Sequence, residues 1–222
     1  MNSIKVYVGN TSSLEDRALF EKLCKTVTSQ RLEKINRISR PEDKRLSLCV
    51  ELLLKKALSD IGVDNYKVER SKNGKPCIKG EENLFFNLSH SGERVMCAVS
   101  SFEIGCDVEK IKPINLKIAK RFFFENEYKA IAELTTEEEQ QNMFFRLWTL
   151  KESFMKVTGL GMKLPLDSFS IDISKNEISV TQNVDENTYF FKEYDLETDY
   201  KYSVCGLVNA FEDVVNINFT EL

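Results

Sequence analysis

Short segments of the chain alternate apolar and polar residues with the two-residue period of a half-buried β-strand. This alternation predicts first-half strands at residues 4–8, 66–70, 77–79, 84–92 and 95–99, and second-half strands at 104–109, 168–173, 177–181, 188–194 and 202–208. The residues after 208 are polar and predict a tail.

Longer segments place apolar residues three and four positions apart, which predicts amphipathic helices. We expect helices from a cap at Ser12 or Ser13 to about Cys24, over 31–37, from Pro41 to about Asp60, at 115–123, at 125–134 and, behind a cap at Asn142, over 143–157. Residues 135–141 are rich in acids and predict a link. Each half runs helices and then strands, so the pattern favours an α+β fold over βαβ winding.

The composition is that of a globular protein. The chain has 222 residues, of which 42% are hydrophobic and 30% charged, enough for one large domain or two of roughly 100 residues each. Apolar runs stay well below the roughly 20 residues that cross a bilayer, and we expect no signal peptide. The six cysteines are scattered without a C-x-x-C pair, as in a reducing compartment. A cytoplasmic protein is therefore expected.

Charge is distributed unevenly along the chain. Residues 1–106 hold 18 basic and 14 acidic side chains, whereas residues 107–222 hold 13 and 21, and the net charge is −4. A mildly basic first half can receive a polyanionic small molecule, while the overall acidity argues against non-specific nucleic-acid binding. With a single histidine, a zinc site is not expected.

Two acids of the predicted strand 104–109 are separated by a single apolar residue. Asp107 and Glu109 share a face, because successive side chains of a strand alternate. Like charges on one face repel each other, and a hard cation such as Mg²⁺ would relieve that repulsion. The alternative is a solvated strand end, and this segment taken alone favours it.

The predicted helix 143–157 carries Glu152 opposite its apolar stripe, with Trp148 and Lys156 one turn to either side. A surface Glu–Lys pair at this spacing is common and stabilises a helix by only about 0.2–0.5 kcal/mol. A tryptophan beside it is less ordinary, because a solvated helix face rarely carries one.

The polar turn Ser89-His90-Ser91 does not fit a hydrolase. His90 is the only histidine, and its strand neighbours point away from it. These groups can instead bind phosphate oxygens, or His90 can be a hydrogen-bonded turn residue. Arg31 and Lys34 share a helix face that either binds a phosphate or is simply solvated. The turn Gly74-Lys75-Pro76 either grips a nucleotide or is structural.

The chain carries, in this order, Gly74-Lys75-Pro76, Phe86-Asn87-Leu88-Ser89-His90-Ser91-Gly92, Ile104-Gly105-Cys106-Asp107-Val108-Glu109 and Trp148-Thr149-Leu150-Lys151-Glu152-Ser153-Phe154-Met155-Lys156. Segments 112–113, 118–123 and 164–169 accompany them. This combination resembles the surfactin-type 4′-phosphopantetheinyl transferase family in motif order and spacing over residues 74–169. Residues 1–60 match loosely and residues 175–222 hardly at all.

The resemblance implies a fold and a reaction. The fold is a monomer whose two similar α+β halves form a pseudo-dimer within one chain, at residues 1–103 and 104–222, with the active site in the cleft between them. The reaction transfers the 4′-phosphopantetheine group of coenzyme A to a serine hydroxyl of an acyl or peptidyl carrier protein. It depends on Mg²⁺, releases adenosine 3′,5′-bisphosphate and is of the holo-[acyl-carrier-protein] synthase type.

The resemblance also implies roles for individual residues. Asp107, Glu109 and Glu152 fall on the family's Mg²⁺ positions, and Asp107, Glu152 and Lys156 on its catalytic positions. The expected coenzyme A contacts are Arg31, Lys34, Ser47, Gly74, Lys75, Pro76, Ser89, His90 and Lys156, with Arg31 standing where relatives often carry lysine. Glu152 is expected to take the proton of the carrier serine, directly or through a metal-bound water, while Lys156 stabilises the departing phosphate.

A basic and aromatic surface around Lys117, Lys120, Arg121 and Phe124 suits an acidic helical partner, and it is the expected docking site of the carrier. Of the three consecutive phenylalanines at 122–124, we expect at least two in the core. The sequence leaves open whether the carrier serves fatty-acid, polyketide or non-ribosomal-peptide synthesis, including that of antibiotics.

Two other functions are possible. A coenzyme A-binding or nucleotide-binding module without catalysis would be expected to lack part of the acidic set, which is complete here. A metal-dependent phosphohydrolase would direct the same acids at water and would release phosphopantetheine from coenzyme A without a carrier.

Overall fold

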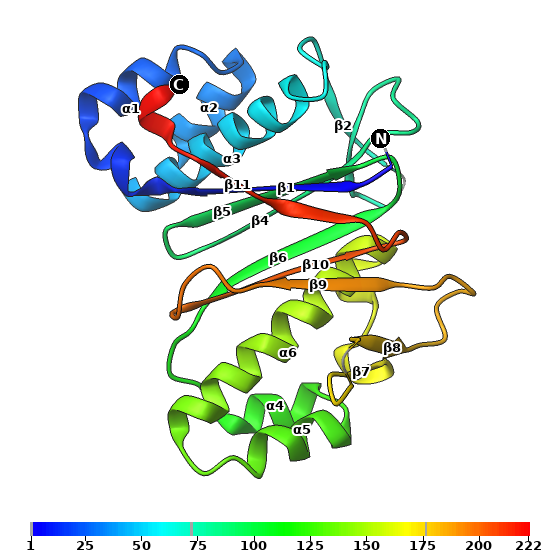
Figure 1. The fold of residues 1–222 in the computed structure, drawn as a ribbon. Helices are drawn as coiled ribbons and strands as arrows, with labels where there is room; N and C mark the ends of the chain where they lie inside the picture. The colour runs from blue at the N-terminus through cyan, green and yellow to red at the C-terminus, as the bar shows by residue number, and fades with distance from the viewer. Residues whose placement is uncertain (1, 72, 176) are drawn as a thin grey trace.

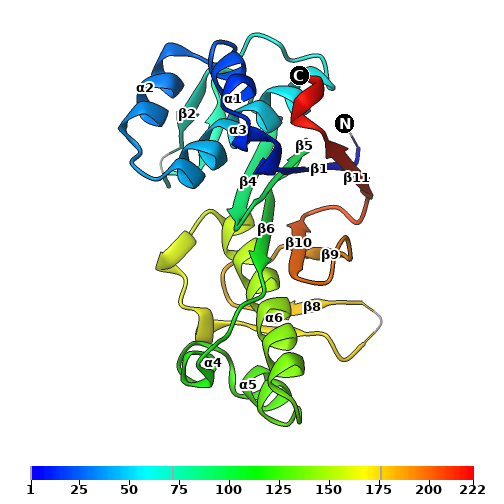
Figure 2. The same cartoon turned by 90° about the vertical axis from the view of Figure 1, so that its left-hand side faces the viewer.

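The computed structural model describes residues 2–71, 73–175 and 177–222, and it stacks two sheets between outer layers of helices (Figures 1 and 2). Helices α1, α2 and α3 cover one face of the first sheet and span Arg17–Cys24, Ser29–Arg37 and Pro41–Ser59, after a 3₁₀ helix, η1, at Thr11–Glu15. The first sheet has the order β11-β1-β5-β4, with bounds Phe211–Ile217, Ile4–Asn10, Arg94–Ser100 and Phe85–Ser91. A small hairpin, β2 and β3, joins Val68–Arg70 to Pro76–Ile78.

The second sheet packs on the long helix α6, Glu137–Thr158 (Figure 1). Its order is β6-β10-β9, with bounds Ile104–Lys110, Tyr200–Gly206 and Phe190–Tyr194. Helices α4 and α5, at Leu116–Phe122 and Glu125–Ala132, and the hairpin of β7 and β8, at Ser170–Asp172 and Ser179–Thr181, complete this half.

A buried ion pair fixes α5 to α6. Lys151 Nζ lies 2.7 Å from both carboxylate oxygens of Glu127, and neither side chain is more than 1% exposed. The carboxylate of Glu127 also accepts hydrogen bonds from the backbone amides of Phe124 and Ile171, so both of its oxygens have further partners. A pair buried this completely defines the arrangement of its elements more than it adds stability.

The two sheets face each other across a third apolar core. Because strand side chains alternate, Val6 and Val8 of β1 point into this core, while Tyr7 points to the helices. Cys106 and Val108 of β6 enter it from the second sheet. The opposite face of β6 is turned towards α6, and it carries the predicted acids.

Helix α6 begins earlier than the sequence pattern predicts. The link at 135–141 and the cap at Asn142 are wrong, because Thr136 is the N-cap and residues 137–141 are helical. Thr136 Oγ1 accepts the amide of Glu139, whose carboxylate accepts the amide of Thr136 in return. This capping box and three acids in the first turn stabilise the helix start.

Both ends of the chain also differ from the prediction. Residues 211–217 form β11 instead of a polar tail, and this strand pairs in parallel with β1. Phe219 then packs so closely on Gly9 that a Cβ there would lie 2.6 Å from its ring. At the other end, Asp16 caps α1 in place of Ser12 or Ser13, because η1 precedes the helix.

The predicted α+β class is confirmed, since helices and mainly antiparallel sheets form separate layers. The last strand of the chain completes the first sheet, and the division at residues 103 and 104 remains a prediction. All six cysteines are free. Among the helices that the structure describes, none combines the length and the apolar character that spanning a bilayer requires.

Candidate active site

A glycine brings strand β6 against helix α6. A Cβ at Gly105 would lie 2.0 Å from the backbone oxygen of Ser153 and 2.5 Å from the backbone nitrogen of Val157. Only glycine permits this approach, because it has no Cβ. Asp107 and Glu109 follow on the same face of the strand and therefore lie beside the helix.

Lys156 of α6 faces the first of these acids. Its Nζ donates hydrogen bonds to Asp107 Oδ1 at 2.7 Å and to the backbone oxygen of Cys106 at 3.0 Å. Glu152 and Trp148 precede Lys156 by one and two turns and lie on the same helix face. The charged groups of the strand and of the helix thus meet.

One cavity of about 330 Å³ collects these groups. We call it the acidic pocket, and it is lined by Leu88, Ser89, His90, Asp107, Glu109, Trp148, Glu152 and Lys156. Strand β4 contributes the first three, β6 the next two and α6 the last three. Glu152 therefore shares a cavity with the two strand acids, although α4 and α5 separate them in the sequence.

The protein offsets the negative charge of this pocket only in part. Burial raises the pKa of Glu152, the charge of Asp107 raises it further, and Lys156 compensates for some of this. Burial also raises the pKa of Glu109, against a hydrogen bond from Ser91 Oγ at 2.7 Å. An added cation would favour the ionised form of both groups.

The pKa values of Lys156 and His90 are shifted in opposite directions. Burial acts to lower the pKa of Lys156, but the charges of Asp107 and Glu152 outweigh it, so the pKa is raised and the amine stays charged. The imidazole of His90 reaches solvent, yet partial desolvation and the charge of Lys156 lower its pKa. His90 is therefore neutral at pH 7.

The donor set fits a hard divalent cation, because Mg²⁺ prefers carboxylate oxygens. Asp107 Oδ2 is buried and has no hydrogen-bond partner in the described part of the chain. No group of three His, Cys, Asp or Glu side chains within residues 2–71, 73–175 and 177–222 is already arranged to hold a metal. The ammonium of Lys156 binds Asp107 Oδ1, which leaves the buried Oδ2 as the oxygen of Asp107 without a hydrogen bond from the described residues.

Three predicted phosphate contacts lie in the helical layer of the first half, outside the lining of the acidic pocket. Arg31 on α2 forms an ion pair with Glu51 on α3 at 2.7 Å, so its charge is already balanced. Ser47 Oγ is buried without a hydrogen-bond partner among the residues described. Lys34 is exposed, and its charge contributes to the lowered pKa of His90, which places it within electrostatic range of the pocket.

The turn Gly74-Lys75-Pro76 lies at a second cavity, of about 340 Å³, which Lys75 and Pro76 line together with Phe85 and Phe86. Gly74 has a φ of +84°, in the left-handed region that favours glycine. Lys75 Nζ donates to the backbone oxygens of Ile104 at 3.0 Å and Val157 at 3.3 Å. The lysine thus ties the β2–β3 hairpin to the start of β6 and the end of α6.

The predicted docking surface on α4 is largely exposed. Phe122 and Phe124 are 39% and 43% exposed and only Phe123 is buried, so the expectation of two core phenylalanines is wrong. Helix α4 ends at Phe122 and α5 begins after Phe124, which lets one ring turn inward and its two neighbours outward. We call the exposed side chains of Lys117, Ile118, Lys120, Arg121, Phe122 and Phe124 the α4 surface.

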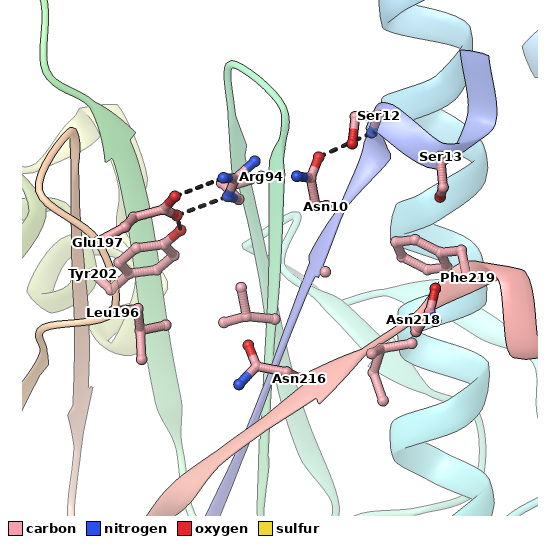
Figure 3. Close-up of a pocket in the computed structure, with 13 residues that line it drawn as sticks. Asn10, Ser12, Ser13, Arg94, Leu196, Glu197, Tyr202, Asn216, Asn218 and Phe219 are labelled. Carbon is pink, nitrogen blue, oxygen red and sulfur yellow. Dashed lines mark hydrogen bonds and ion pairs between the residues drawn. The ribbon is translucent and has the colours of Figure 1, made fainter.

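A third cavity, of about 450 Å³, lies between the first sheet and β10 and shares no lining residue with the acidic pocket (Figure 3). Arg94 of β5 donates two parallel hydrogen bonds to Glu197, from Nε at 2.7 Å and from Nη2 at 2.6 Å. The hydroxyl of Tyr202 donates to the same carboxylate. Burial acts to raise the pKa of Glu197, but these partners outweigh it and lower the pKa. Arg94 thus joins the first sheet to the second.

Sequence reasoning missed residues whose partners are remote. Arg94 and Glu197 are 103 positions apart, and nothing local relates them. Ser91 did carry a signal, because it stands two residues after Ser89 as Glu109 stands two after Asp107. That matched spacing predicts equivalent contacts if the two segments run side by side.

Two sequence models of known families match the chain. The family described as the 4′-phosphopantetheinyl transferase superfamily matches residues 103–205, and the one described as 4′-phosphopantetheinyl transferase, N-terminal, matches residues 15–102. A solved holo-[acyl-carrier-protein] synthase (AcpS) from Thermotoga maritima matches at 16% identity with a TM-score of 0.41, over 48% of this chain and 62% of that chain, and nothing further follows from so low a likeness.

Individual relatives match over almost the whole length. The 4′-phosphopantetheinyl transferase Sfp of Bacillus subtilis (strain 168) is 34% identical over 222 residues, which cover 98% of this chain and 97% of the relative. The 4′-phosphopantetheinyl transferase gsp of Aneurinibacillus migulanus is 35% identical over 210 residues, 93% of this chain and 86% of the relative. Because both halves match and these relatives align over more than nine tenths of the chain, the chain belongs to the 4′-phosphopantetheinyl transferase superfamily.

Proposed function

We propose that this protein transfers the 4′-phosphopantetheine group of coenzyme A to a serine hydroxyl of an acyl or peptidyl carrier protein. The reaction releases adenosine 3′,5′-bisphosphate and depends on Mg²⁺. The observation that carries the proposal is the acidic pocket, in which Asp107, Glu109, Glu152 and Lys156 line one cavity in a chain of this superfamily.

Phosphoryl transfer needs positioning and charge neutralisation more than covalent participation by the protein. Asp107, Glu109 and Glu152 would hold the magnesium ion, which when bound polarises the pyrophosphate and offsets the charge of the leaving group. Lys156 keeps its proton at neutral pH, and we assign it to the phosphate that departs. The neutral imidazole of His90 can donate a hydrogen bond without adding charge.

Glu152 is the residue that we assign as the base. Its carboxylate lines the acidic pocket beside Lys156, and a bound cation would keep it ionised and so able to accept a proton, although as a weaker base than a free carboxylate. It would take the proton of the carrier serine, directly or through an intervening water. The deprotonated hydroxyl then attacks the phosphorus in line with the leaving group.

Coenzyme A would extend from the acidic pocket across the first half of the chain. We assign its phosphates to Arg31, Lys34, Ser47, His90 and Lys156, and its adenine to the turn Gly74-Lys75-Pro76. The position of Lys34 near His90 and the cavity beside Lys75 support this path. Arg31 would exchange its ion pair with Glu51 for a phosphate. The proposal includes a monomer of two similar halves, 1–103 and 104–222, with the site between them.

The α4 surface is the docking site that we assign to the carrier, because it combines exposed aromatic rings with Lys117, Lys120 and Arg121. Lys117→Glu with Lys120→Glu should raise the KM for the carrier about tenfold and leave coenzyme A affinity unchanged. Lys22→Glu with Lys25→Glu, in the last turn and at the C-cap of α1, applies the same change of net charge in the first half and serves as the control. An unchanged carrier KM would place the docking site elsewhere.

Intact-mass spectrometry tests the reaction itself. A panel of apo carriers incubated with coenzyme A and Mg²⁺ should gain about 340 Da on one serine, and the carriers that react identify the pathway served. Release of phosphopantetheine without carrier modification would identify a phosphohydrolase instead. Binding of coenzyme A with neither reaction would leave only a binding module.

A further inference from the structure

Strands β4 and β6 run side by side but belong to different sheets, as the last strand of the first sheet and the first strand of the second (Figure 1). Strand β6 pairs through its backbone with β10 on its other side. Its amides that face β4 therefore need acceptors from another source, because a buried amide without a partner is costly.

Three alternating side chains of β4 supply these acceptors. Asn87 Oδ1 accepts the amide of Cys106 at 2.9 Å, Ser89 Oγ accepts that of Val108 at 3.3 Å and Ser91 Oγ accepts that of Lys110 at 3.1 Å. Both strands advance by two residues at each step, which is the period that keeps side chains on one face. We call these three β4 residues the side-chain ladder.

Each serine of the ladder makes a second hydrogen bond. Ser89 Oγ donates a hydrogen bond to Asp107 Oδ1 at 2.7 Å, and Ser91 Oγ donates one to Glu109 Oε2 at 2.7 Å. A hydroxyl can accept one hydrogen bond while it donates another, which an alanine cannot do. The same contact thus occurs twice, once for each acid of β6.

The remaining step of the ladder follows the same logic. The residue before Cys106 is Gly105, which has no carboxylate to orient. At this step β4 carries Asn87, whose side-chain oxygen can accept the amide of Cys106 but has no hydroxyl proton to donate. Hydroxyls therefore stand only where β6 has an acid.

We propose that Ser89 and Ser91 are positioning residues, which hold the carboxylates of Asp107 and Glu109 in the orientation that binds Mg²⁺. The inference rests on the proposed function. Ser91 does not line the acidic pocket, so it acts through Glu109. Ser89 has one proton and gives it to Asp107, so this role replaces the donor role towards phosphate expected from the family resemblance.

The contacts also show which carboxylate oxygens have partners within the protein. Ser89 and Lys156 both bind Asp107 Oδ1, and Oδ2 is left without a partner among the described residues. Ser91 binds Glu109 through Oε2 alone. Partners of this kind, behind the groups that bind a metal, typically change metal affinity by roughly 10–100-fold when they are removed.

A Mg²⁺ titration of the protein without coenzyme A tests the inference. Trp148 is the single tryptophan and lines the acidic pocket, so its fluorescence reports binding. Ser91→Ala should weaken Mg²⁺ binding roughly 10–100-fold. Ser91→Thr keeps the hydroxyl and should restore affinity, while Ser91→Cys keeps the size with a weaker donor and should lie between the two.

Ser203→Ala is the matched control. Ser203 lies on β10 and pairs with Asp107 through the backbone, on the other side of β6. Its hydroxyl is buried and has no hydrogen-bond partner in the described residues, so its removal should leave Mg²⁺ binding unchanged. Thermal melting of each variant without metal shows that it is folded, and Ser91→Cys carries the test should Ser91→Ala unfold.

Each other outcome overturns the inference. Wild-type affinity in Ser91→Ala shows that Glu109 needs no partner, and equal loss in Ser91→Thr shows that the hydroxyl is not what matters. If the wild type modifies a carrier and Ser91→Ala binds Mg²⁺ as tightly as the wild type, this inference is wrong and the proposed function still holds. A wild-type protein that neither binds Mg²⁺ nor modifies a carrier removes both.

Discussion

The acidic pocket and the Arg94–Glu197 pair both lie where the two sheets meet, but their carboxylates have very different surroundings. Glu197 accepts two hydrogen bonds from Arg94 and one from Tyr202, and its pKa is lowered. Glu109 and Glu152 share their cavity with a third acid, and their pKa values are raised. The protein thus neutralises the charge of Glu197, whereas it offsets the charge of the acids in the acidic pocket only in part.

This difference separates a structural contact from a reactive one. A carboxylate whose partners are all supplied by the protein holds elements together and has little left for a ligand. Acids with uncompensated charge destabilise the fold and persist where binding or catalysis needs them. If the proposed function holds, a bound cation and substrate would stabilise the charge of the acidic pocket, whereas the Arg94–Glu197 pair needs neither.

The sharpest way to break this comparison is to neutralise one acid in each region. Glu152→Gln removes the assigned base and should slow transfer about 10²–10⁴-fold while coenzyme A still binds, because proton transfer is lost. Glu197→Gln should leave transfer close to that of the wild type. Holo-carrier formation measured by mass spectrometry gives both rates, with Glu138→Gln at the exposed start of α6 as the control. Near-normal turnover of Glu152→Gln would remove Glu152 from the mechanism.

The free energy of unfolding should fall in Glu197→Gln, the variant in which transfer is expected to be almost unchanged. Glu197→Gln leaves the guanidinium of Arg94 without its carboxylate and should lower the free energy of unfolding by about 1.5–3 kcal/mol. For a chain of this size that is a fall in Tm of roughly 2–4 °C per kcal/mol. Urea unfolding at pH 7 measures the loss. A Glu197→Gln variant as stable as the wild type would show that the pair is dispensable.

The stabilisation by Glu197 should also depend on pH. Its folded-state pKa lies below the unfolded value of about 4.3, so its contribution is complete above that pH and is lost as the pH falls through the folded pKa. The difference in unfolding free energy between the wild type and Glu197→Gln should therefore be constant from pH 7 to about 5 and shrink towards pH 3. A difference that persists at pH 3 would mean that the charge of Glu197 is not its source.

The smallest expected effect is a gain in stability. The folded-state pKa of Glu152 is raised, so its ionised form destabilises the fold at neutral pH. Glu152→Gln should therefore be about 0.5–2 kcal/mol more stable than the metal-free wild type at pH 7. The gain should disappear as the pH falls below the unfolded value of about 4.3. Urea unfolding with a chelator present measures this gain. A Glu152→Gln variant less stable than the wild type at pH 7 would show that the charge of Glu152 does not destabilise the fold.

Local patterns predicted the elements that carry the candidate site. The alternation in residues 104–109 placed Asp107 and Glu109 on one face, and the helical period placed Trp148, Glu152 and Lys156 on one face of α6. The start of α6 also has a local signal, because the Thr136–Glu139 capping box marks Thr136 as its N-cap. Such features depend only on neighbours in sequence.

Other features depend on which strands become neighbours. The run 211–217 becomes β11 because the open edge of β1 accepts it, and a polar strand of this kind has no strong signal of its own. The side-chain ladder exists because two sheet edges meet without backbone pairing. Phe122 and Phe124 face outward because the chain turns between α4 and α5.

The sequence by itself determined the superfamily, the α+β class and the identity of the acids, since these follow from short-range periodicity and motif spacing. Only the tertiary structure decided that Glu152 joins Asp107 and Glu109 in one cavity, that Arg31 is paired with Glu51, and that serines of β4 bind the acids of β6. The reason is physical, because hydrogen bonds and charge interactions act over a few ångströms in space. Separation along the chain does not set those distances.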